Sequence, residues 1–305
     1  MNVRHLRFFV ALSEKRHFGR AAAACDVSQP ALSMAIRRLE SELGVRLIER
    51  GGAGMIGLTD AGEALVIRAR QTVSSVEGIT AEATRLRGQL NATLRLGTVP
   101  TAVAAAPTLI APLIDAHPGV RVEIRTAPAD VLVGEVLRHE LDAALVYDDV
   151  GAPSLELRPL YSERFVLVGT PDDDDDDKVD VSWRSVGERS LCLLTPEMQH
   201  RVIVDDALRS AGVVVRPRVQ ADSFALLLGF VRQGWATVIG HTWLMGEHLP
   251  AGTRARTILD PVIEPTIALI AAAAGPPAPV VRALTDSLAG TDVEALIETA
   301  LSGES

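Results

Sequence analysis

Polar side chains at helical spacing between residues 29 and 38 form the first group whose residue types could do chemistry. Gln29, Ser33 and Arg37 recur every four residues, and Met34 and Arg38 form a second row beside them. On a helix, residues four apart share one face. Amide, hydroxyl and guanidinium groups hydrogen-bond to base edges in the major groove of DNA, and guanidinium groups also neutralise phosphates. The spacing therefore predicts a face that reads DNA, with an ordinary solvated helix face as the alternative.

Glycines form the second group. The sequence GAGMIG from Gly52 to Gly57 matches the GxGxxG pattern of dinucleotide-binding turns and suggests an alternative function, that of a nicotinamide-dependent oxidoreductase. The preceding stretch carries Arg46, Glu49 and Arg50, whereas the first strand of a dinucleotide-binding unit is nearly all apolar. No GxSxG motif and no nucleophile with an assignable base occurs. We therefore interpret the glycines as a flexible turn and expect neither a cofactor nor an enzyme.

Hydroxyl side chains that precede predicted helices form the third group. Thr98 and Thr101 lie before one helix, and Thr195 lies before a helix that carries Gln199 and His200. Helix N-termini expose unpaired N–H groups and favour anions. We therefore expect a small anion or carboxylate to bind between these helix starts, with simple helix capping as the alternative role of each threonine.

No pattern predicts a metal site. Asp172 to Asp177 is a run of acids of the kind that forms solvated loops, and the seven histidines form no close ligand cluster. Cys25 and Cys192 are far apart and belong to no CxxC motif, which excludes a disulfide framework and favours a reducing compartment.

The DNA-reading face needs a small helical core behind it. The sequence predicts an amphipathic helix from Val3 to Arg16, a short helix from Arg20 to Cys25 and a third from Gln29 to Leu43. Ser28 can cap the third helix, and Pro30 suits its first turn. The apolar stripe that faces the core is predicted to be Leu32, Ile36, Leu39 and Leu43.

A long helix is predicted from Thr59 to Leu90. Its apolar residues alternate at spacings of four and three over more than three heptads. Such a seam predicts pairing of two copies of the chain, with packing inside its own domain as the alternative. The residues we expect at the dimer contact are Leu65, Val76, Ile79 and Leu86.

From Thr93 onward, short apolar runs alternate with helical stretches. LRLGTV, VRVEIRT and LDAALVY indicate a βαβαβ unit with a parallel sheet, and RFVLVG, SLCLLT, RPRVQA and ATVIG form a second set of strands. The chain then returns through TIALIAAAA and two helices. This order predicts an α/β domain of two lobes joined by two crossings, with a ligand in the cleft.

The charge is distributed unevenly. The net charge is −9, yet residues 1–90 carry 13 Lys+Arg against 9 Asp+Glu, while the remainder carries 17 against 30. A basic module attached to an acidic one suits a nucleic-acid partner for the first. No segment has the length and apolar character of a signal peptide or a membrane helix, so we expect a cytoplasmic protein without a membrane partner, which argues against an exported solute receptor.

The stretch AAAACDVSQPALSMAIRRLESELGVRLIER, followed by LTDAGEAL, resembles the winged helix-turn-helix of LysR-type transcriptional regulators. The resemblance runs from Val3 to Leu65, and the later elements match the family's effector domain, which is similar to periplasmic solute receptors. It implies a recognition helix from Gln29 to Leu43, a wing from Val45 to Leu58, and a linker helix that pairs two subunits. The implied DNA contacts are Arg20, Ser28, Gln29, Pro30, Ser33, Met34, Arg37, Arg38 and Arg50. The implied effector contacts are Thr98, Thr101, Thr195, Gln199, His200, Ser223 and His241.

Three features refine this resemblance. The wing is rich in glycine and has few basic residues after Arg50, and Met34 stands where a polar residue is common in the family. The stretch LCLLTPEMQHR is similar to regulators associated with formate dehydrogenase or cyanate metabolism, which makes formate one candidate effector.

We therefore expect an α/β protein with three parts. Residues 1–58 form an all-α winged helix-turn-helix, 59–90 form the dimerisation helix, and 91–305 form the effector-binding domain, with lobe I at 91–161 and 266–305 and lobe II at 162–265. The expected partners are double-stranded promoter or operator DNA, a small-molecule effector, RNA polymerase and further copies of the chain in a dimer or tetramer. Effector binding is expected to move the paired DNA-binding domains.

Overall fold

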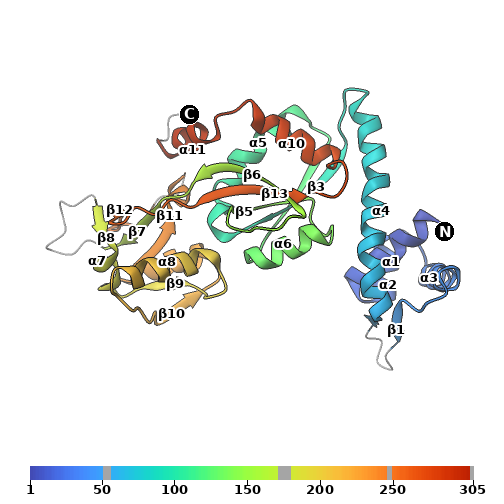
Figure 1. Cartoon of the computed structure of the whole chain (residues 1–305), viewed down its shortest axis with the longest axis horizontal. Helices are drawn as coiled ribbons and strands as arrows, with labels where there is room; N and C mark the ends of the chain where they lie inside the picture. Colours follow the sequence, from blue (N-terminus) through green and yellow to red (C-terminus); the bar gives the residue numbers. More distant parts are fainter. Residues whose placement is uncertain (51–55, 171–179, 246–248, 303–305) are drawn as a thin grey trace. The chain divides into compact units, whose positions relative to one another are not determined.

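The computed structural model describes residues 1–50, 56–170, 180–245 and 249–302 (Figure 1). These residues form two compact units. The first comprises Met1–Leu90 with Arg138–Glu140, and the second comprises Asn91–Leu137 and Leu141–Ser305. Each unit is described by itself below.

Three helices form the core of the first unit: α1 (Val3–Lys15), α2 (Phe18–Ala24) and α3 (Gln29–Leu43). Helix α3 begins as predicted, because the Ser28 hydroxyl accepts the Ala31 N–H at 3.4 Å. It ends at Gly44, whose φ of 71° favours glycine. The prediction that Leu43 belongs to the buried stripe is wrong: its side chain in the last turn is 38% exposed. The core that the helices share contains Phe9, Leu12, Leu32, Ile36 and Leu39.

An antiparallel hairpin follows, formed by β1 (Ile48–Arg50) and β2 (Ile56–Leu58). The Glu40 carboxylate of α3 accepts the Leu47 N–H at 2.9 Å and the Ile48 N–H at 3.3 Å, which fixes the start of the hairpin. Most of the GxGxxG pattern, residues 52–55, lies outside the described residues. Its last two residues belong to strand β2, which pairs antiparallel with β1, whereas a dinucleotide turn leads directly into a helix.

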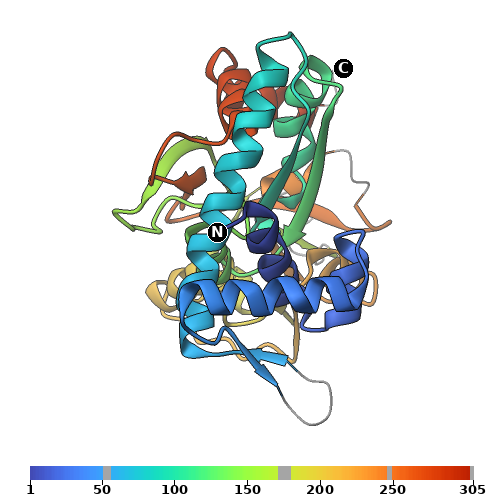
Figure 2. The ribbon, with the colours of Figure 1, turned by 90° about the vertical axis from the view of Figure 1, so that its right-hand side faces the viewer.

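The long helix α4 (Asp60–Arg85) is shorter than predicted. Thr59 caps it by accepting the Gly62 N–H at 3.0 Å. The helix ends before Leu86 because the chain turns at Gly88, whose φ of 79° is left-handed. Figure 2 shows α3 lying crosswise to α4 in this unit, with the hairpin beside the start of α4. No helix of the described residues combines the length and the apolar character needed to cross a membrane.

A five-stranded sheet organises the first part of the second unit, in the order β4-β3-β5-β13-β6. Strand β3 pairs parallel with β4 and β5, as predicted, while β13 pairs antiparallel with β5 and β6. Helices α5, α10 and α11 lie on one side of the sheet and α6 on the other (Figure 1). The bounds are β3 Ala92–Thr98, β4 Val120–Thr126, β5 Ala143–Tyr147, β6 Leu155–Ser162, β13 Thr266–Ala272, α5 Ala106–Ala116, α6 Ala129–Leu137, α10 Pro279–Ala289 and α11 Val293–Ser302.

A second sheet has the order β11-β7-β12-β8, and β9 and β10 pair separately as parallel strands. The chain passes between the two sheets twice, from β6 to β7 and from β12 to β13. The two crossings touch, since the Glu163 N–H donates to Pro265 O at 2.8 Å. The bounds are β7 Phe165–Gly169, β8 Asp180–Ser182, β9 Cys192–Leu194, β10 Val219–Ala221, β11 Thr237–Gly240, β12 Arg254–Leu259, α7 Trp183–Gly187, α8 Gln199–Ser210 and α9 Phe224–Val231.

Two short 3-10 helices lie next to the crossings. Helix η1 (Pro100–Val103) follows β3 of the first sheet, and helix η2 (His241–Leu244) follows β11 of the second. Neither was predicted from the sequence. Thr101, predicted to lie before a helix, is inside η1, and Thr98 is the last residue of β3.

Candidate DNA-binding surface and effector site

The outward face of α3 presents the predicted DNA-reading side chains. Gln29, Arg37 and Arg38 are exposed, Met34 is 67% exposed and Ser33 is half-buried. Arg38 pairs with Glu42 four residues later at 3.2 Å. An exposed ion pair of this kind contributes little to stability. Arg37 has no ion-pair partner among the residues that the structure describes. Neither guanidinium group would therefore have to break a strong interaction in order to contact a nucleic acid.

The remaining candidate DNA contacts lie around the start of α3 and in the hairpin. Arg20 is exposed on α2, while the Ser28 hydroxyl is engaged as the cap of α3 and Pro30 occupies its first turn. The backbone of Arg50 ends β1, but its side chain lies outside the described residues. Ser28 and Pro30 thus lie together at the start of α3.

The apolar seam of α4 divides into two halves. Leu65 packs against the core of the first unit, and Ala69 is buried in it. Val76 is half-buried, whereas Ile79 is 71% exposed and Leu86 is 74% exposed. Packing within its own domain therefore accounts only for the first half of the seam, and the second half presents large apolar side chains to solvent.

Thr98 and Thr101 are both buried at the carboxyl end of β3, but their hydroxyls differ. The Thr98 hydroxyl donates to the carbonyl of Val99 at 3.0 Å, so its proton is used locally. The buried Thr101 hydroxyl makes no hydrogen bond of ordinary length and angle within the described parts of the chain. Neither side chain has exposed surface, and the Thr101 hydroxyl lies near Tyr147.

Thr195 follows β9 in the second sheet region. The prediction that the next helix begins directly after it is wrong: a turn closed by the Met198 N–H and Thr195 O at 3.1 Å intervenes, and α8 begins at Gln199. No side chain caps the start of α8. The buried Thr195 hydroxyl oxygen makes no hydrogen bond of ordinary length and angle among the described residues. It does lie near the Glu197 carboxylate, whose pKa is lowered by its own backbone N–H and by the Thr195 hydroxyl. Ser223 precedes α9, and it too makes no capping hydrogen bond.

Gln199 and His200, adjacent on α8, face different surroundings. The Gln199 side-chain amide donates to Asp149 Oδ2 at 2.6 Å, which links α8 to the loop after β5. His200 is only 3% exposed, and its ring stands edge-on to Phe165 and Phe224. Burial lowers the pKa of His200 to about 3, so the imidazole is neutral near pH 7. These contacts support a packing role for His200.

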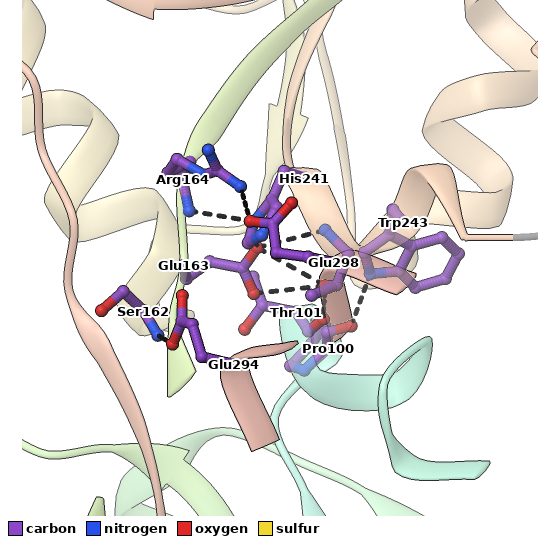
Figure 3. Close-up of polar contacts among 10 residues, drawn as sticks. Pro100, Thr101, Ser162, Glu163, Arg164, His241, Trp243, Glu294 and Glu298 are labelled. Atoms are coloured by element: carbon purple, nitrogen blue, oxygen red, sulfur yellow. Dashed lines mark hydrogen bonds and ion pairs between the residues drawn. The ribbon is translucent and has the colours of Figure 1, made fainter. Parts of the chain in front are cut away.

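His241 joins a buried polar cluster that the sequence did not reveal (Figure 3). Its Nδ1 lies 2.8 Å from Glu163 Oε1, and the Glu163 side chain has no exposed surface. Tyr147 and Tyr161 are buried beside this carboxylate. Burial raises the pKa of both tyrosines well above the ordinary value, and the charge of Glu163 adds to that shift. No local pattern connects these residues, because Glu163 and His241 are 78 positions apart.

Neither cysteine resembles a reactive thiol. Burial raises the pKa of Cys192 to about 11, and its Sγ lies against the carbonyls of Ala236 at 3.4 Å and Leu227 at 3.7 Å. Burial also raises the pKa of Cys25, and the nearby acidic side chains of Asp26 and Glu14 add to the shift. A reactive cysteine needs a lowered pKa and access to solvent. The described residues also contain no group of His, Cys, Asp and Glu that could hold a metal ion.

Two family matches cover most of the chain. Residues 3–63 match the bacterial regulatory helix-turn-helix protein, lysR family, and residues 87–292 match the LysR substrate binding domain. The first match contains the hairpin and the exposed face of α3. The second contains η1, η2 and the two sheets. Both matched families belong to regulators, so the oxidoreductase alternative is excluded.

Individual relatives agree with these matches. A probable hydrogen peroxide-inducible genes activator of Streptomyces viridosporus is 32% identical over 81% of this chain and 80% of its own length. The HTH-type transcriptional regulator BbuR of Bordetella bronchiseptica is 30% identical over 87% of this chain and 82% of its own. A full-length OxyR variant from Pseudomonas aeruginosa is 28% identical, with a TM-score of 0.77 over 94% of this chain and 97% of that one. The chain belongs to the LysR family of transcriptional regulators.

Proposed function

We propose that this LysR-family regulator responds to a small anion, such as a carboxylate, bound between its two sheets. The observation that carries the proposal is the uncapped start of α8 beside the Thr195 hydroxyl, which makes no hydrogen bond of ordinary length and angle within the described residues. A free helix N-terminus directs N–H groups and a positive partial charge at a ligand. The uncapped start of α9 at Ser223 supports the same ligand class.

The first sheet supplies the opposing side of the proposed site. Thr101 offers a hydroxyl that no described residue occupies in ordinary hydrogen-bond geometry. The hydrogen bond from Gln199 to Asp149 supports a close approach of the α8 start to the carboxyl end of β5, which is the neighbour of β3 in the sheet. A ligand that bridges the two sides would favour one relative placement of the sheets, and that change is what the family's regulatory mechanism requires.

Hydrogen peroxide is the second candidate signal, because the Streptomyces viridosporus relative is named as a peroxide-inducible activator. Peroxide sensing through a thiol needs an accessible thiolate. The raised pKa values of Cys25 and Cys192 and the burial of Cys192 argue against that chemistry. We therefore favour reversible binding of an anion, with formate among the compounds to be tested.

For DNA recognition we propose the exposed face of α3, with Gln29 and Ser33 directed at bases and Arg37 and Arg38 at guanine or phosphate. Pairing of two chains through Val76, Ile79 and Leu86 of α4 would place two such helices on a site with approximate twofold symmetry. The exposed apolar second half of α4 supports this pairing.

The proposal of an anion site is tested by a thermal-shift screen of small carboxylates, followed by calorimetry of the compound that binds. Losing a hydrogen bond to a charged ligand costs roughly 1.5–3 kcal/mol, so Thr195→Val and Thr101→Val should each weaken its affinity about 10- to 150-fold. Thr285→Val is the matched control, because that hydroxyl donates to Val281 O inside α10. Wild-type affinity in both test variants would place the ligand elsewhere.

A further inference from the structure

Two hydrogen bonds connect the helix η1, which carries Thr101, to helix η2 from the second sheet. The Thr242 hydroxyl lies 3.4 Å from the carbonyl oxygen of Thr101. The Trp243 indole N–H donates to the carbonyl oxygen of Pro100 at 3.1 Å. Both acceptors are backbone atoms of η1, so the contacts bear on the position of the helix itself and do not involve the Thr101 hydroxyl (Figure 3).

Helix η2 is in turn fixed by the buried carboxylate of Glu163 on the first crossing. Glu163 Oε2 lies 3.2 Å from the Thr242 hydroxyl, and Oε1 lies 3.4 Å from the Thr242 N–H. The backbone supports the same attachment, because the His241 N–H donates to Arg164 O at 2.8 Å. Gly240 leaves room for the carboxylate, since a Cβ at that position would lie 2.4 Å from Glu163 Oε1.

The Thr242 hydroxyl is therefore placed between two acceptors, Thr101 O and the Glu163 carboxylate. A hydroxyl has one proton to donate, and neither of these groups can donate to it, so it donates to one of the two acceptors at a time while it packs against both. Its site is buried: Thr101, Glu163 and Thr242 have no exposed surface. In such surroundings, a polar group that loses its partner is costly, so removing the hydroxyl should loosen the attachment of η1.

We propose that Thr242 and Trp243 are positioning residues, which hold η1 and so set the placement of Thr101 in the proposed effector site. This inference rests on the proposed effector site, to which it adds a device that couples the second sheet to the ligand contact in the first. Movement of one sheet relative to the other would change the hydrogen bonds to η1, and with them the placement of Thr101.

Hydrogen exchange of the full-length protein without any ligand tests the inference. The reporter is the Ala102 amide in η1, which donates to Val99 O at 3.1 Å. Loss of one buried hydrogen bond corresponds to roughly 2- to 10-fold faster exchange, so we expect this acceleration in Thr242→Val and in Trp243→Phe. Peptides from strand β3 should exchange at the wild-type rate in both variants.

Two controls separate positioning from general loosening. Thr242→Ser keeps the hydroxyl and should restore wild-type exchange. Glu294→Gln changes a carboxylate of α11 that accepts the Ser162 N–H on the same crossing at 3.0 Å, and it should leave Ala102 unaffected. Unchanged exchange in Thr242→Val, equal acceleration in Thr242→Ser, or acceleration of β3 by the same factor would overturn the inference. The exchange result stands independently of whether any carboxylate binds.

Discussion

The imidazole of His200 stands edge-on to the Phe224 ring, with the ring centroids 5.0 Å apart. Phe165 makes the same kind of contact with His200 at 5.0 Å, so the imidazole is enclosed by aromatic edges and faces. Such an environment offers no partner for a positive charge. His200 is therefore a neutral packing residue of α8, directly beside the uncapped helix start that we propose for the anion.

This burial makes the stability of the protein depend on pH. Burial lowers the pKa of His200 to about 3 from the ordinary value of 6.5, so between these values the unfolded chain binds more protons than the folded one. Stability therefore falls as the pH drops below 6.5, by at most about 1.4 kcal/mol per pH unit from this group. Urea unfolding should show that the free energy of unfolding falls between pH 7.5 and pH 5.5. This fall should be about 1 kcal/mol smaller in His200→Leu than in the wild-type protein. An equal loss in both proteins would contradict the assignment.

The α3 face predicts a salt-dependent interaction with duplex DNA. Arg37→Ala and Arg38→Ala should each cost about 1–3 kcal/mol of operator affinity if the residue is bidentate to guanine, and should mainly reduce the salt slope if it meets phosphate. Fluorescence anisotropy at several salt concentrations distinguishes a contact to guanine from a contact to phosphate. Arg209→Ala, which removes an exposed arginine of α8, is the control. Undiminished operator affinity in the double variant would exclude this face.

We expect two copies of the chain to pair through the exposed apolar seam of α4. Ile79→Asp places a carboxylate in an apolar contact, where it would be desolvated without a partner, so sedimentation should detect smaller particles. Thr80→Asp is the matched control, since Thr80 is the exposed neighbour of Ile79 on the same helix and lies off the seam. Unchanged mass in Ile79→Asp would show that the pairing uses another surface.

Local signals explain which parts of the fold could be predicted. Helix α3 begins at its predicted residue because Ser28 and Pro30 act within one turn. Strand β6 could not be predicted, because its sequence LELRPLYS mixes polar and apolar residues and contains Pro159. That proline is tolerated because β6 is at the edge of the sheet, a fact of the tertiary structure alone. Strand β12, with the sequence RARTIL, was missed for its polar composition.

The candidate effector site was only partly predictable. Thr101 and Thr195 were found through expected helix starts, although Thr101 lies within η1 and α8 begins four residues after Thr195. Glu163, Tyr147 and Tyr161 were missed, since the fold brings Tyr147 at the end of β5 next to the separate segment that carries Tyr161 and Glu163. No spacing rule connects the two segments. The acidic run Asp172 to Asp177, expected to form a solvated loop, lies within residues 171–179, outside the described residues.

Operator binding by the full-length protein, measured in the presence of small carboxylates and, separately, of hydrogen peroxide, tests the proposed effector class most directly. We expect that a carboxylate changes operator affinity, that the change persists in the Cys25→Ser, Cys192→Ser double variant, and that hydrogen peroxide has no effect on the wild-type protein. A response of the wild-type protein to peroxide that disappears in the double variant, together with no response to any carboxylate, would contradict the proposed effector class.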